Sequence, residues 1–358
     1  MVLAEEIVPK QWCTSEIVLL YKKGNPKDIG NYRPISLLNS IYKLFAAVLL
    51  QRIERDIEKG QTIEQAGFRS GFNTLDHIQT VEQIIEKYKE FNRPLYIAFV
   101  DYSKAFDTIS HNSIWKTLQN LNVNIKYINI IKFIYTHSKS KIKLETCGSE
   151  ITLGRGVRQG DPLSPKLFIA VLENIFRKLN WKQKGLNING KYLTHLRFAD
   201  DIVIFAETAK SLTEMLQTLN EESLKVGLEM NSNKTKVMTN SNKSQIEVRN
   251  KAIDYVDDYI YLGKQISFRN SNNDEEIERR ANITWKRFWS LKEVLKGDYS
   301  ITMKRTVFET CLLPCLLYGC QTWVYTQKSK QKIKTTQRAM ERSILSIRKI
   351  QKISSENI

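Results

Sequence analysis

The segment LTHLRFADDIVIFAE at residues 193–207 constrains the fold most strongly, because it places two aspartates between two apolar runs. Residues 194–198 and 202–205 are rich in β-branched and aromatic side chains, which favour strands. Only Ala199, Asp200 and Asp201 separate the runs, a spacing typical of a tight hairpin. Aspartate is common in turns because its side chain hydrogen-bonds nearby backbone, but two adjacent carboxylates repel each other unless a cation lies beside them. The pair alone therefore leaves a turn and a metal site equally open.

The charge balance of the chain favours a polyanionic partner. Hydrophobic residues make up 42% of the 358 residues and charged residues 26%, as in globular proteins of two or three domains. Lys and Arg outnumber Asp and Glu by 55 to 38, which gives a formal net charge of +17 and favours nucleic acid over a membrane surface. Residues 275–358 hold 17 Lys and Arg against 8 Asp and Glu, so the C-terminal part carries +9 of that charge.

Neither the cysteines nor the apolar segments indicate a secreted or membrane protein. The five scattered cysteines do not form a disulfide framework and suit a reducing compartment. The first residues lack the basic region and apolar run of a signal peptide. No segment reaches the roughly 18–20 apolar residues of a membrane span. We therefore expect a soluble, intracellular protein.

Hydrophobic periodicity predicts a mixed α+β region up to about residue 270, followed by a mainly helical, basic region. We expect a β-hairpin over residues 15–40 and a short strand at 259–266. One helix should begin near residue 164, with Ser164 as its cap and Pro165 in its first turn. Another should end at Gly227. The polar segment 269–276 is expected to be a linker.

Asp101 follows the apolar run PLYIAFV at residues 94–100, which predicts a strand buried on both faces. Its carboxylate can cap the next helix, or it can face a substrate at the end of the strand. If the hairpin of residues 193–207 pairs beside this strand, Asp101, Asp200 and Asp201 meet at one sheet edge. Carboxylate oxygens are the ligands that Mg²⁺ prefers. Two such ions, about 3.5–4 Å apart, would activate an attacking hydroxyl and stabilise a leaving pyrophosphate.

Five ordered motifs of the chain resemble those of reverse transcriptases. They are VDYSKAFDTISH at 100–111, GVRQGDPLSP at 156–165, FADD at 198–201, GLEMNSNKTK at 227–236 and YLG at 261–263. The chain is most similar to the enzymes of eukaryotic non-LTR retrotransposons. The resemblance implies an α+β right-hand polymerase, with fingers and palm in residues 1–270 as an antiparallel sheet packed on helices. It also implies a helical, basic, thumb-like region in residues 271–358.

For catalysis, the resemblance implies that Asp101 and Asp200 are the principal metal ligands and that Asp201 completes the triad. The cofactor would be two Mg²⁺ ions, or Mn²⁺ in their place. Lys234 matches a lysine that helps to protonate the leaving pyrophosphate. Phe106 matches the bulky residue that excludes a ribose 2′-hydroxyl, so its large ring favours deoxynucleotides.

For substrate binding, the resemblance implies that Gln159 contacts the incoming nucleotide and the templating base. Gly160, like Gly156, would allow a close approach of backbone and nucleic acid, since glycine carries no Cβ. Further residues match known contacts of the family: Lys22, Lys23 and Arg33 those to the triphosphate, and Tyr261, Leu262 and Gly263 the primer grip.

The implied function is RNA-directed DNA synthesis by two-metal nucleotidyl transfer, as part of a retrotransposon polyprotein or a fragment of one. Its partners would be an RNA template, a DNA primer and dNTPs. Two alternatives remain open. An RNA-dependent RNA polymerase shares the palm chemistry, although the ring of Phe106 argues against it. A catalytically decayed remnant that only binds nucleic acid would keep the fold and the charge.

Overall fold

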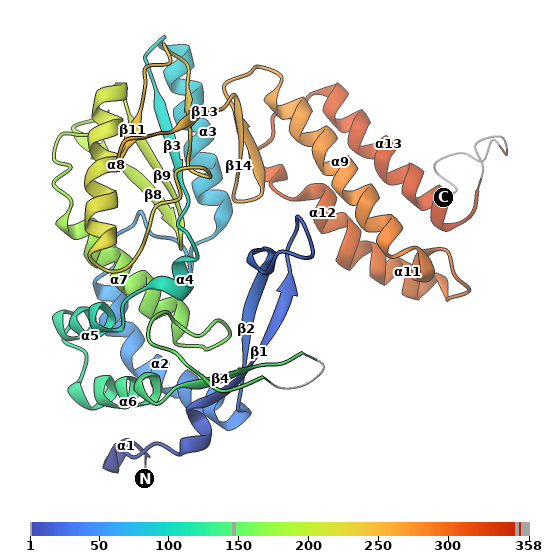
Figure 1. Ribbon diagram of the computed structural model, residues 1–358. Coiled ribbons are helices and arrows are strands. Elements are labelled where there is room, and N and C mark those ends of the chain that lie inside the picture. The colour runs from blue at the N-terminus through green and yellow to red at the C-terminus, as the bar shows by residue number, and fades with distance from the viewer. Residues whose placement is uncertain (1, 145–147, 348–350, 352–358) are drawn as a thin grey trace. The chain divides into compact units, whose positions relative to one another are not determined.

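The structure is a computed structural model that describes residues 2–144, 148–347 and 351, and it divides into two compact units. The first unit comprises Met1–Thr74 and Asn92–Val256, and the second comprises Leu75–Phe91 and Asp257–Ile358. Figure 1 labels the elements of both units. This division does not coincide with the expected boundary at residue 270, because the second unit begins at Asp257 and also takes up an earlier helix.

The first unit contains a five-stranded sheet in the order β13-β10-β3-β9-β8. Its strands are β3 (Tyr96–Val100), β8 (His195–Phe198), β9 (Asp201–Ala206), β10 (Lys236–Thr239) and β13 (Asp254–Tyr255). Neighbouring strands are antiparallel except for the short parallel pair of β10 and β13. All five residues of β3 are buried, as the apolar run predicted. The expected antiparallel sheet is thus confirmed, and β3 lies at its centre.

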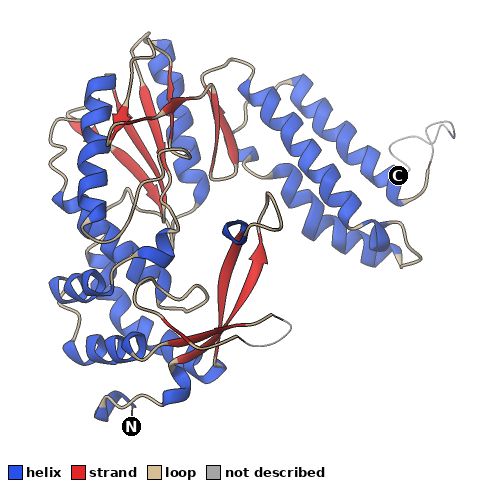
Figure 2. Ribbon diagram, viewed as in Figure 1, coloured by secondary structure: helices blue, strands red, loops and turns tan. Residues whose placement is uncertain are grey.

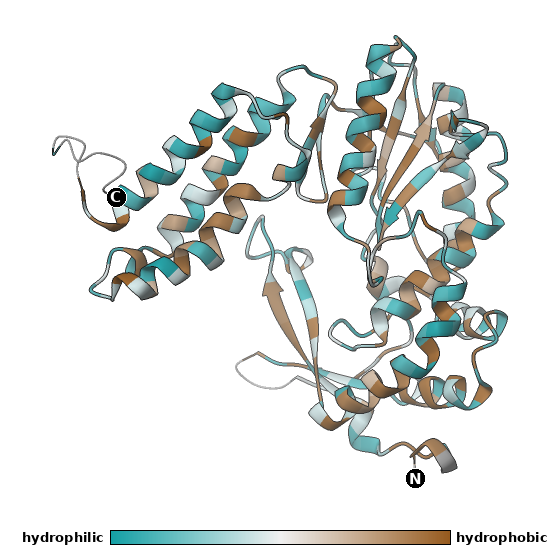
Figure 3. Ribbon diagram, turned by 180° about the vertical axis from the view of Figure 1, so that it is seen from behind, coloured by the Kyte–Doolittle hydropathy of each residue, from teal (hydrophilic) through white to brown (hydrophobic). Residues whose placement is uncertain are grey.

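Helices form the core of the first unit together with one face of this sheet. Alternate residues of β3 and β9, such as Ala98 and Ile204, belong to the same hydrophobic cluster as the helices. Helix α7 (Ser164–Lys178) is buried along most of its length, and α8 (Ala209–Leu224) packs against both α7 and β9. Figure 2 shows these helices beside the strands, and Figure 3 shows the apolar character of the sheet. The core therefore supports β3 and β9 at the edge where Asp101 and Asp201 lie.

The second sheet of the first unit has the strand order β2-β1-β4-β5. The hairpin predicted for residues 15–40 is present, because β1 (Thr14–Tyr21) pairs antiparallel with β2 (Tyr32–Leu38). Strand β4 (Lys139–Ile142) joins β1 in parallel, and β5 (Ile151–Thr152) pairs with β4. The remaining elements of this unit are α1 (Val2–Glu5), α2 (Ser40–Lys59), α4 (Ala105–Thr108), α5 (His111–Asn120), α6 (Ile125–Thr136), β6 (Leu186–Ile188), β7 (Lys191–Leu193), β11 (Glu247–Val248) and β12 (Lys251–Ala252), with short 3-10 turns at Lys10–Trp12 and Ile29–Asn31.

The second unit joins a helix from the first third of the chain to the C-terminal helices. It contains α3 (Thr74–Glu90), β14 (Asp258–Tyr261), β15 (Lys264–Ser267), α9 (Asn272–Ser290), α10 (Lys292–Leu295), α11 (Ile301–Val307), a π-helical turn at Phe308–Leu312, α12 (Leu313–Leu317), a 3-10 turn at Cys320–Thr322 and α13 (Gln327–Ile344). Helix α9 contacts α12, α13 and β15. A separate core forms around Phe288, Leu312 and Met340. The expected helical character after residue 270 is thus confirmed.

Four local predictions need correction. Ser164 is the first residue of α7 and not its cap; the cap position is Leu163, whose N–H donates to Asp161 Oδ1 at 3.0 Å. Helix α8 ends at Leu224, and Gly227 follows it with a positive φ of 87°.

The other two corrections concern residues 259–276. The segment 259–266 is a hairpin rather than one strand, since β14 and β15 pair across the turn Leu262–Gly263. The linker expected at 269–276 is wrong as well, because α9 begins at Asn272. The segment is polar because it contains the start of a helix and not because it is a linker. Asp274 and Glu275 lie in the first turn of α9, where carboxylates interact favourably with the helix dipole.

Among the described residues, no helix combines the length and apolarity needed to cross a bilayer. Four of the five cysteines are described, and they are free thiols. Cys147 lies outside the described residues.

Candidate active site

The three aspartates meet at one edge of the central sheet because of its register. Val100, the last residue of β3, lies opposite Ile202 of β9. Asp101 follows β3 directly, and Asp201 is the first residue of β9, so both lie at the same end of the paired strands. Asp200 occupies the adjoining turn of the β8–β9 hairpin, which Phe198 and Asp201 close. All three carboxylates line a single cavity.

A loop that sequence reasoning left unassigned holds the turn that carries Asp200. Gln65 is fully buried, and its Oε1 accepts hydrogen bonds from the backbone N–H of Gly67 at 2.8 Å and of Ala199 at 3.1 Å. The N–H of Ala66 donates to the carbonyl of Arg197 at 2.9 Å. Ala199 itself is in the left-handed region, with φ 57°. The turn is therefore fixed by residues 65–67 and not only by its own strands.

Burial and mutual repulsion disfavour the ionised forms of these aspartates. Burial raises the pKa of Asp101, and the ammonium of Lys234 partly opposes it. Burial and the charge of Asp101 raise the pKa of Asp200, which Arg33 and Lys22 lower in turn. Burial, followed by the charges of Asp200 and Asp101, raises the pKa of Asp201 to about 6. A nearby cation would relieve this repulsion.

The carboxylates fit a divalent cation in donor chemistry. Asp101 Oδ2 is buried without a hydrogen-bond partner, and it lies 3.7 Å from the Nζ of Lys234. With the two neighbouring aspartates it offers the hard oxygen ligands that Mg²⁺ and Mn²⁺ take. Over residues 2–144, 148–347 and 351, however, no three His, Cys, Asp or Glu side chains are arranged closely enough to hold an ion. The aspartates thus face one cavity without forming a closed ligand set.

The cavity has a volume of 1110 Å³ and gathers predicted residues from five distant segments of the first unit. The predicted residues that line it are Lys22, Arg33, Asp101, Phe106, Gln159, Gly160, Asp200, Asp201 and Lys234. Lys23 belongs to the same hairpin tip but does not line the cavity. Tyr261, Leu262 and Gly263 form the turn of the β14–β15 hairpin and belong to the second unit.

Phe106 is held by two other aromatic rings. Its ring stacks on that of Phe168 at a centroid distance of 4.5 Å and an interplanar angle of 16°. The ring of Phe68 meets it edge-on at 6.5 Å. Phe168 is fully buried in α7, whereas Phe106 and Phe68 line the cavity. The ring of Phe106 is therefore supported from the core, and the sequence offered no signal that Phe168 would be its partner.

Gln159 is fixed at both its backbone and its side chain. Its carbonyl accepts the N–H of Ser36 in β2 at 2.7 Å, and its Nε2 donates to Asp107 Oδ1 at 2.9 Å. Gly160 has φ 108°, and a Cβ there would lie 2.8 Å from the carbonyl oxygen of Ser36. The close approach of this glycine is therefore to β2.

Asp107 was not among the predicted site residues, but it lines the cavity and its carboxylate orients the amide of Gln159. Burial raises the pKa of Asp107. Its place inside the VDYSKAFDTISH motif was the only available signal.

A buried charged network lies beneath the loop that carries Gln159. Arg158 Nη2 donates to Asp161 Oδ2 at 2.7 Å and also to the hydroxyl of Tyr42, and the side chains of Arg158 and Asp161 are 1% and 0% exposed. The hydroxyl of Tyr42 donates to Asp161 Oδ2 at 2.5 Å. Because an unpaired buried charge is costly, this network ties the loop to α2 and to the start of α7.

Comparison with known proteins points to one family. The model of that family, described as reverse transcriptase (RNA-dependent DNA polymerase), matches residues 21–266. Over 232 residues the chain is 31% identical to the Retrovirus-related Pol polyprotein from type-1 retrotransposable element R2 of Nasonia vitripennis, covering 64% of this chain and 22% of that protein. It is 25% identical to the RNA-directed DNA polymerase from mobile element jockey of Drosophila funebris, over 94% of this chain and 38% of that protein.

Solved structures agree on the fold. The apo telomerase of Candida tropicalis superposes with a TM-score of 0.54 at 14% identity, covering 94% of this chain and 64% of that one. The chain spans about a fifth to two fifths of the length of the R2 and jockey proteins named above.

Proposed function

Because the chain belongs to the reverse transcriptase family, with its right-hand polymerase fold, we propose that it extends a DNA primer with dNTPs on an RNA template. The observation that carries this proposal is the register of β3 and β9, which brings Asp101 to the edge where Asp200 and Asp201 lie. The net charge of +17 suits a nucleic-acid duplex. We also propose that residues 1–270 act as fingers and palm and residues 271–358 as a thumb.

Reverse transcriptases depend on divalent metal. We propose two Mg²⁺ ions, or Mn²⁺ in their place, held by Asp101, Asp200 and Asp201. When bound, the ions would neutralise phosphate charge and activate the primer hydroxyl. The protein contributes the carboxylates at one sheet edge, and the buried Oδ2 of Asp101, which accepts no hydrogen bond, supports their assignment as ligands.

The lysine and arginine side chains of the cavity suit the triphosphate of the incoming nucleotide. Lys22 and Arg33 line the cavity from the β1–β2 hairpin, and Lys23 lies at the tip of the same hairpin. Lys234 faces Asp101 across 3.7 Å and would donate a proton to the leaving pyrophosphate. The side chain of Lys234 is 68% exposed, so its ammonium is free to move from Asp101 toward a bound phosphate. These residues position and neutralise phosphate, which is the main task of a phosphoryl-transfer site.

Selection of the nucleotide falls to Phe106 and Gln159. The Phe106 ring, supported by Phe168, would exclude a 2′-hydroxyl. The amide of Gln159, oriented by Asp107, would contact the nucleotide and the templating base. The turn Tyr261–Leu262–Gly263 would serve as the primer grip.

A primer-extension assay tests the proposal. An RNA template with a DNA primer, dNTPs and Mg²⁺ should give extension by the unaltered chain. Asp200→Ala should abolish extension and leave duplex affinity unchanged, because it removes a carboxylate and no basic residue. Asp56→Ala, a change on the surface of α2, is the matched control and should extend like the unaltered chain.

The outcomes separate the alternatives. Extension with rNTPs in preference to dNTPs would indicate an RNA polymerase. Duplex binding without incorporation in Mg²⁺ or Mn²⁺ would indicate a remnant that only binds nucleic acid, and would overturn the proposal.

A further inference from the structure

The turn of the β14–β15 hairpin is held at both of its carbonyls by side chains of the second unit. Leu262 and Gly263 adopt positive φ values of 45° and 83°, between the paired residues Tyr261 and Lys264. The hydroxyl of Tyr318, which follows α12, donates to the carbonyl of Leu262 at 2.7 Å. The carbonyl of Gly263 accepts from Arg279 Nη2 at 2.6 Å and from Arg280 Nη2. A turn tied at two consecutive carbonyls cannot swing independently of α9.

Glu276 fixes the two arginines that reach this turn. It is fully buried, and it accepts from Arg279 Nε and Arg280 Nε at 2.7 Å each. Its Oε2 also accepts the backbone N–H of Gln265, in β15, at 3.1 Å. A buried carboxylate that accepts from two guanidinium groups and a backbone N–H is held in one geometry, because rotating it away would leave buried charges unpaired. Glu276 therefore joins α9 to both the strand and the turn of the hairpin.

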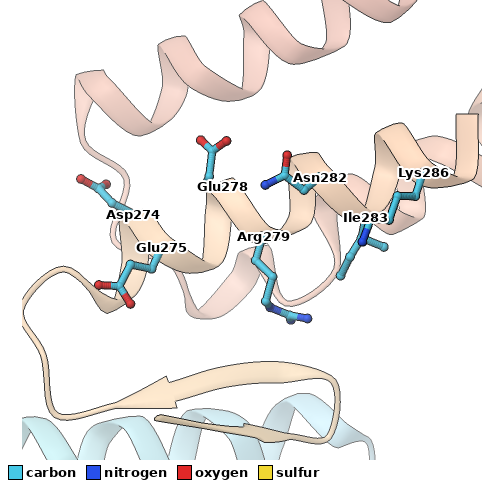
Figure 4. Close-up of a pocket in the computed structure, with 7 residues that line it drawn as sticks. All are labelled: Asp274, Glu275, Glu278, Arg279, Asn282, Ile283 and Lys286. Atoms are coloured by element: carbon cyan, nitrogen blue, oxygen red, sulfur yellow. The ribbon is translucent and has the colours of Figure 1, made fainter. Parts of the chain in front are cut away.

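The ring of Tyr318 completes the arrangement. The guanidinium of Arg280 lies 4.5 Å from the ring centroid of Tyr318, so the two donors to the turn also pack on each other. Figure 4 shows Arg279 directed from α9 toward the hairpin, whereas Glu278 points to the opposite side of the helix. The carbonyls of the turn, the buried carboxylate of Glu276 and the ring of Tyr318 are thus joined in one network through the two arginines.

We propose that Glu276, Arg280 and Tyr318 are positioning residues for the primer terminus and act through the Leu262–Gly263 turn. This inference rests on the proposed function, in which that turn is the primer grip. None of the three residues needs to touch the primer. Their hydrogen bonds set the place of the turn relative to α9, so loosening them would weaken the hold of the turn on the primer strand.

Two conservative variants test the network. Tyr318→Phe removes one hydroxyl and keeps the ring under Arg280. Arg280→Lys keeps the positive charge beside Glu276 but cannot reproduce the two-nitrogen contact to Glu276 and Gly263. Tyr299→Phe is the control for Tyr318→Phe, because Tyr299 is 51% exposed. Arg287→Lys is the control for Arg280→Lys, because Arg287 is an exposed residue of α9.

The kinetic readout separates positioning from simple loss of folded protein. The single-turnover extension rate per active site should fall about five- to tenfold in each variant, the order expected for one hydrogen bond. The KM for dNTP and the Kd for primer–template should stay within about twofold. The preference for matched over mismatched primer ends should also fall, and this ratio is independent of the fraction of active protein. Both controls should match the unaltered chain.

Hydrogen exchange gives a readout that does not depend on catalysis. Adding primer–template should slow amide exchange in residues 258–267 of the unaltered chain, and Tyr318→Phe should reduce that protection. If the unaltered chain fails to extend primers, the proposed function fails, and this measurement still decides whether the turn meets the duplex. Absence of protection overturns the inference. So do a normal extension rate and a normal mismatch ratio in both variants.

Discussion

Replacing Gly67 with alanine tests how tightly the Asp200 turn is placed. A Cβ at position 67 would lie 2.2 Å from the backbone nitrogen of Ala199 and 2.9 Å from the carbonyl carbon of Phe198. Both neighbours are backbone atoms of the turn, so no side chain can move aside to accommodate the methyl group. Restoring an ordinary van der Waals contact of 3.4 Å requires a displacement of about 1.2 Å, either of the turn or of residues 65–67.

We expect Gly67→Ala to lower the single-turnover extension rate about 100-fold, because a misplacement of about 1 Å at a reacting group costs that order of rate. The free energy of unfolding should fall by about 1–3 kcal/mol, the usual cost of overpacking a buried site. Single-nucleotide extension with saturating dNTP and duplex measures the first effect, and urea denaturation measures the second.

Gly154→Ala is the control, since a Cβ there meets no heavy atom within 4 Å and the backbone of Gly154 is not left-handed. It should leave both quantities unchanged. A Gly67→Ala protein that extends primers within about twofold of the unaltered rate, with unchanged stability, would refute the view that residues 65–67 position the turn.

Three further changes test other parts of the first unit. Phe168→Leu should reduce the preference for dNTP over rNTP about tenfold, since the Phe106 ring loses a stacked partner worth about 1 kcal/mol. The ratio of the kcat/KM values for dNTP and rNTP measures this preference. An unchanged ratio would contradict the view that Phe168 supports the ring of Phe106. Burial lowers the pKa of His111, so the folded state binds fewer protons than the unfolded state and stability should fall as the pH drops below about 6.5. His111→Gln should reduce this dependence of the free energy of unfolding on pH, measured by denaturation between pH 7 and 5. The same dependence in the variant and the unaltered chain would exclude the histidine as its source. Arg158→Met should cost about 3–5 kcal/mol because it leaves the buried carboxylate of Asp161 without its positively charged partner. A denaturation midpoint equal to that of the unaltered chain would show that the network is dispensable.

The residues of the catalytic edge were predictable from the sequence because their signals are local. An apolar run before Asp101 and two strand-forming runs around Asp200 identify two strands, and a pair of strands has few ways to place the three carboxylates. The structure has them pair directly, as the prediction required.

The supporting residues could not be found in the same way. Each supporting residue acts through a partner that is far away in the sequence. Gln65 contacts Ala199, 134 residues away, and Phe168 contacts Phe106, 62 residues away. Arg158 contacts Tyr42, 116 residues away. No periodicity encodes such contacts, because they arise only when the elements pack. The linker expected at 269–276 failed for a related reason. A first helical turn rich in Asn, Asp and Glu has the composition of a loop, and its order depends on tertiary contacts such as those of Arg269 with Asp258 and Glu275.

The second unit is assembled from two separate stretches of the chain, and this imposes an order of events during synthesis. Lys89 of α3 donates to the carbonyl of Phe268 at 2.8 Å, a partner that is made 179 residues later. At about 5–20 residues per second, α3 must wait on the order of ten to thirty seconds at the ribosome before that partner emerges. Lys264 is likewise buried against Glu82, with 2.5 Å between Nζ and Oε1. A fragment that starts at Asp257 would carry this ammonium without its carboxylate, so dissecting the protein at that point should yield an unstable product.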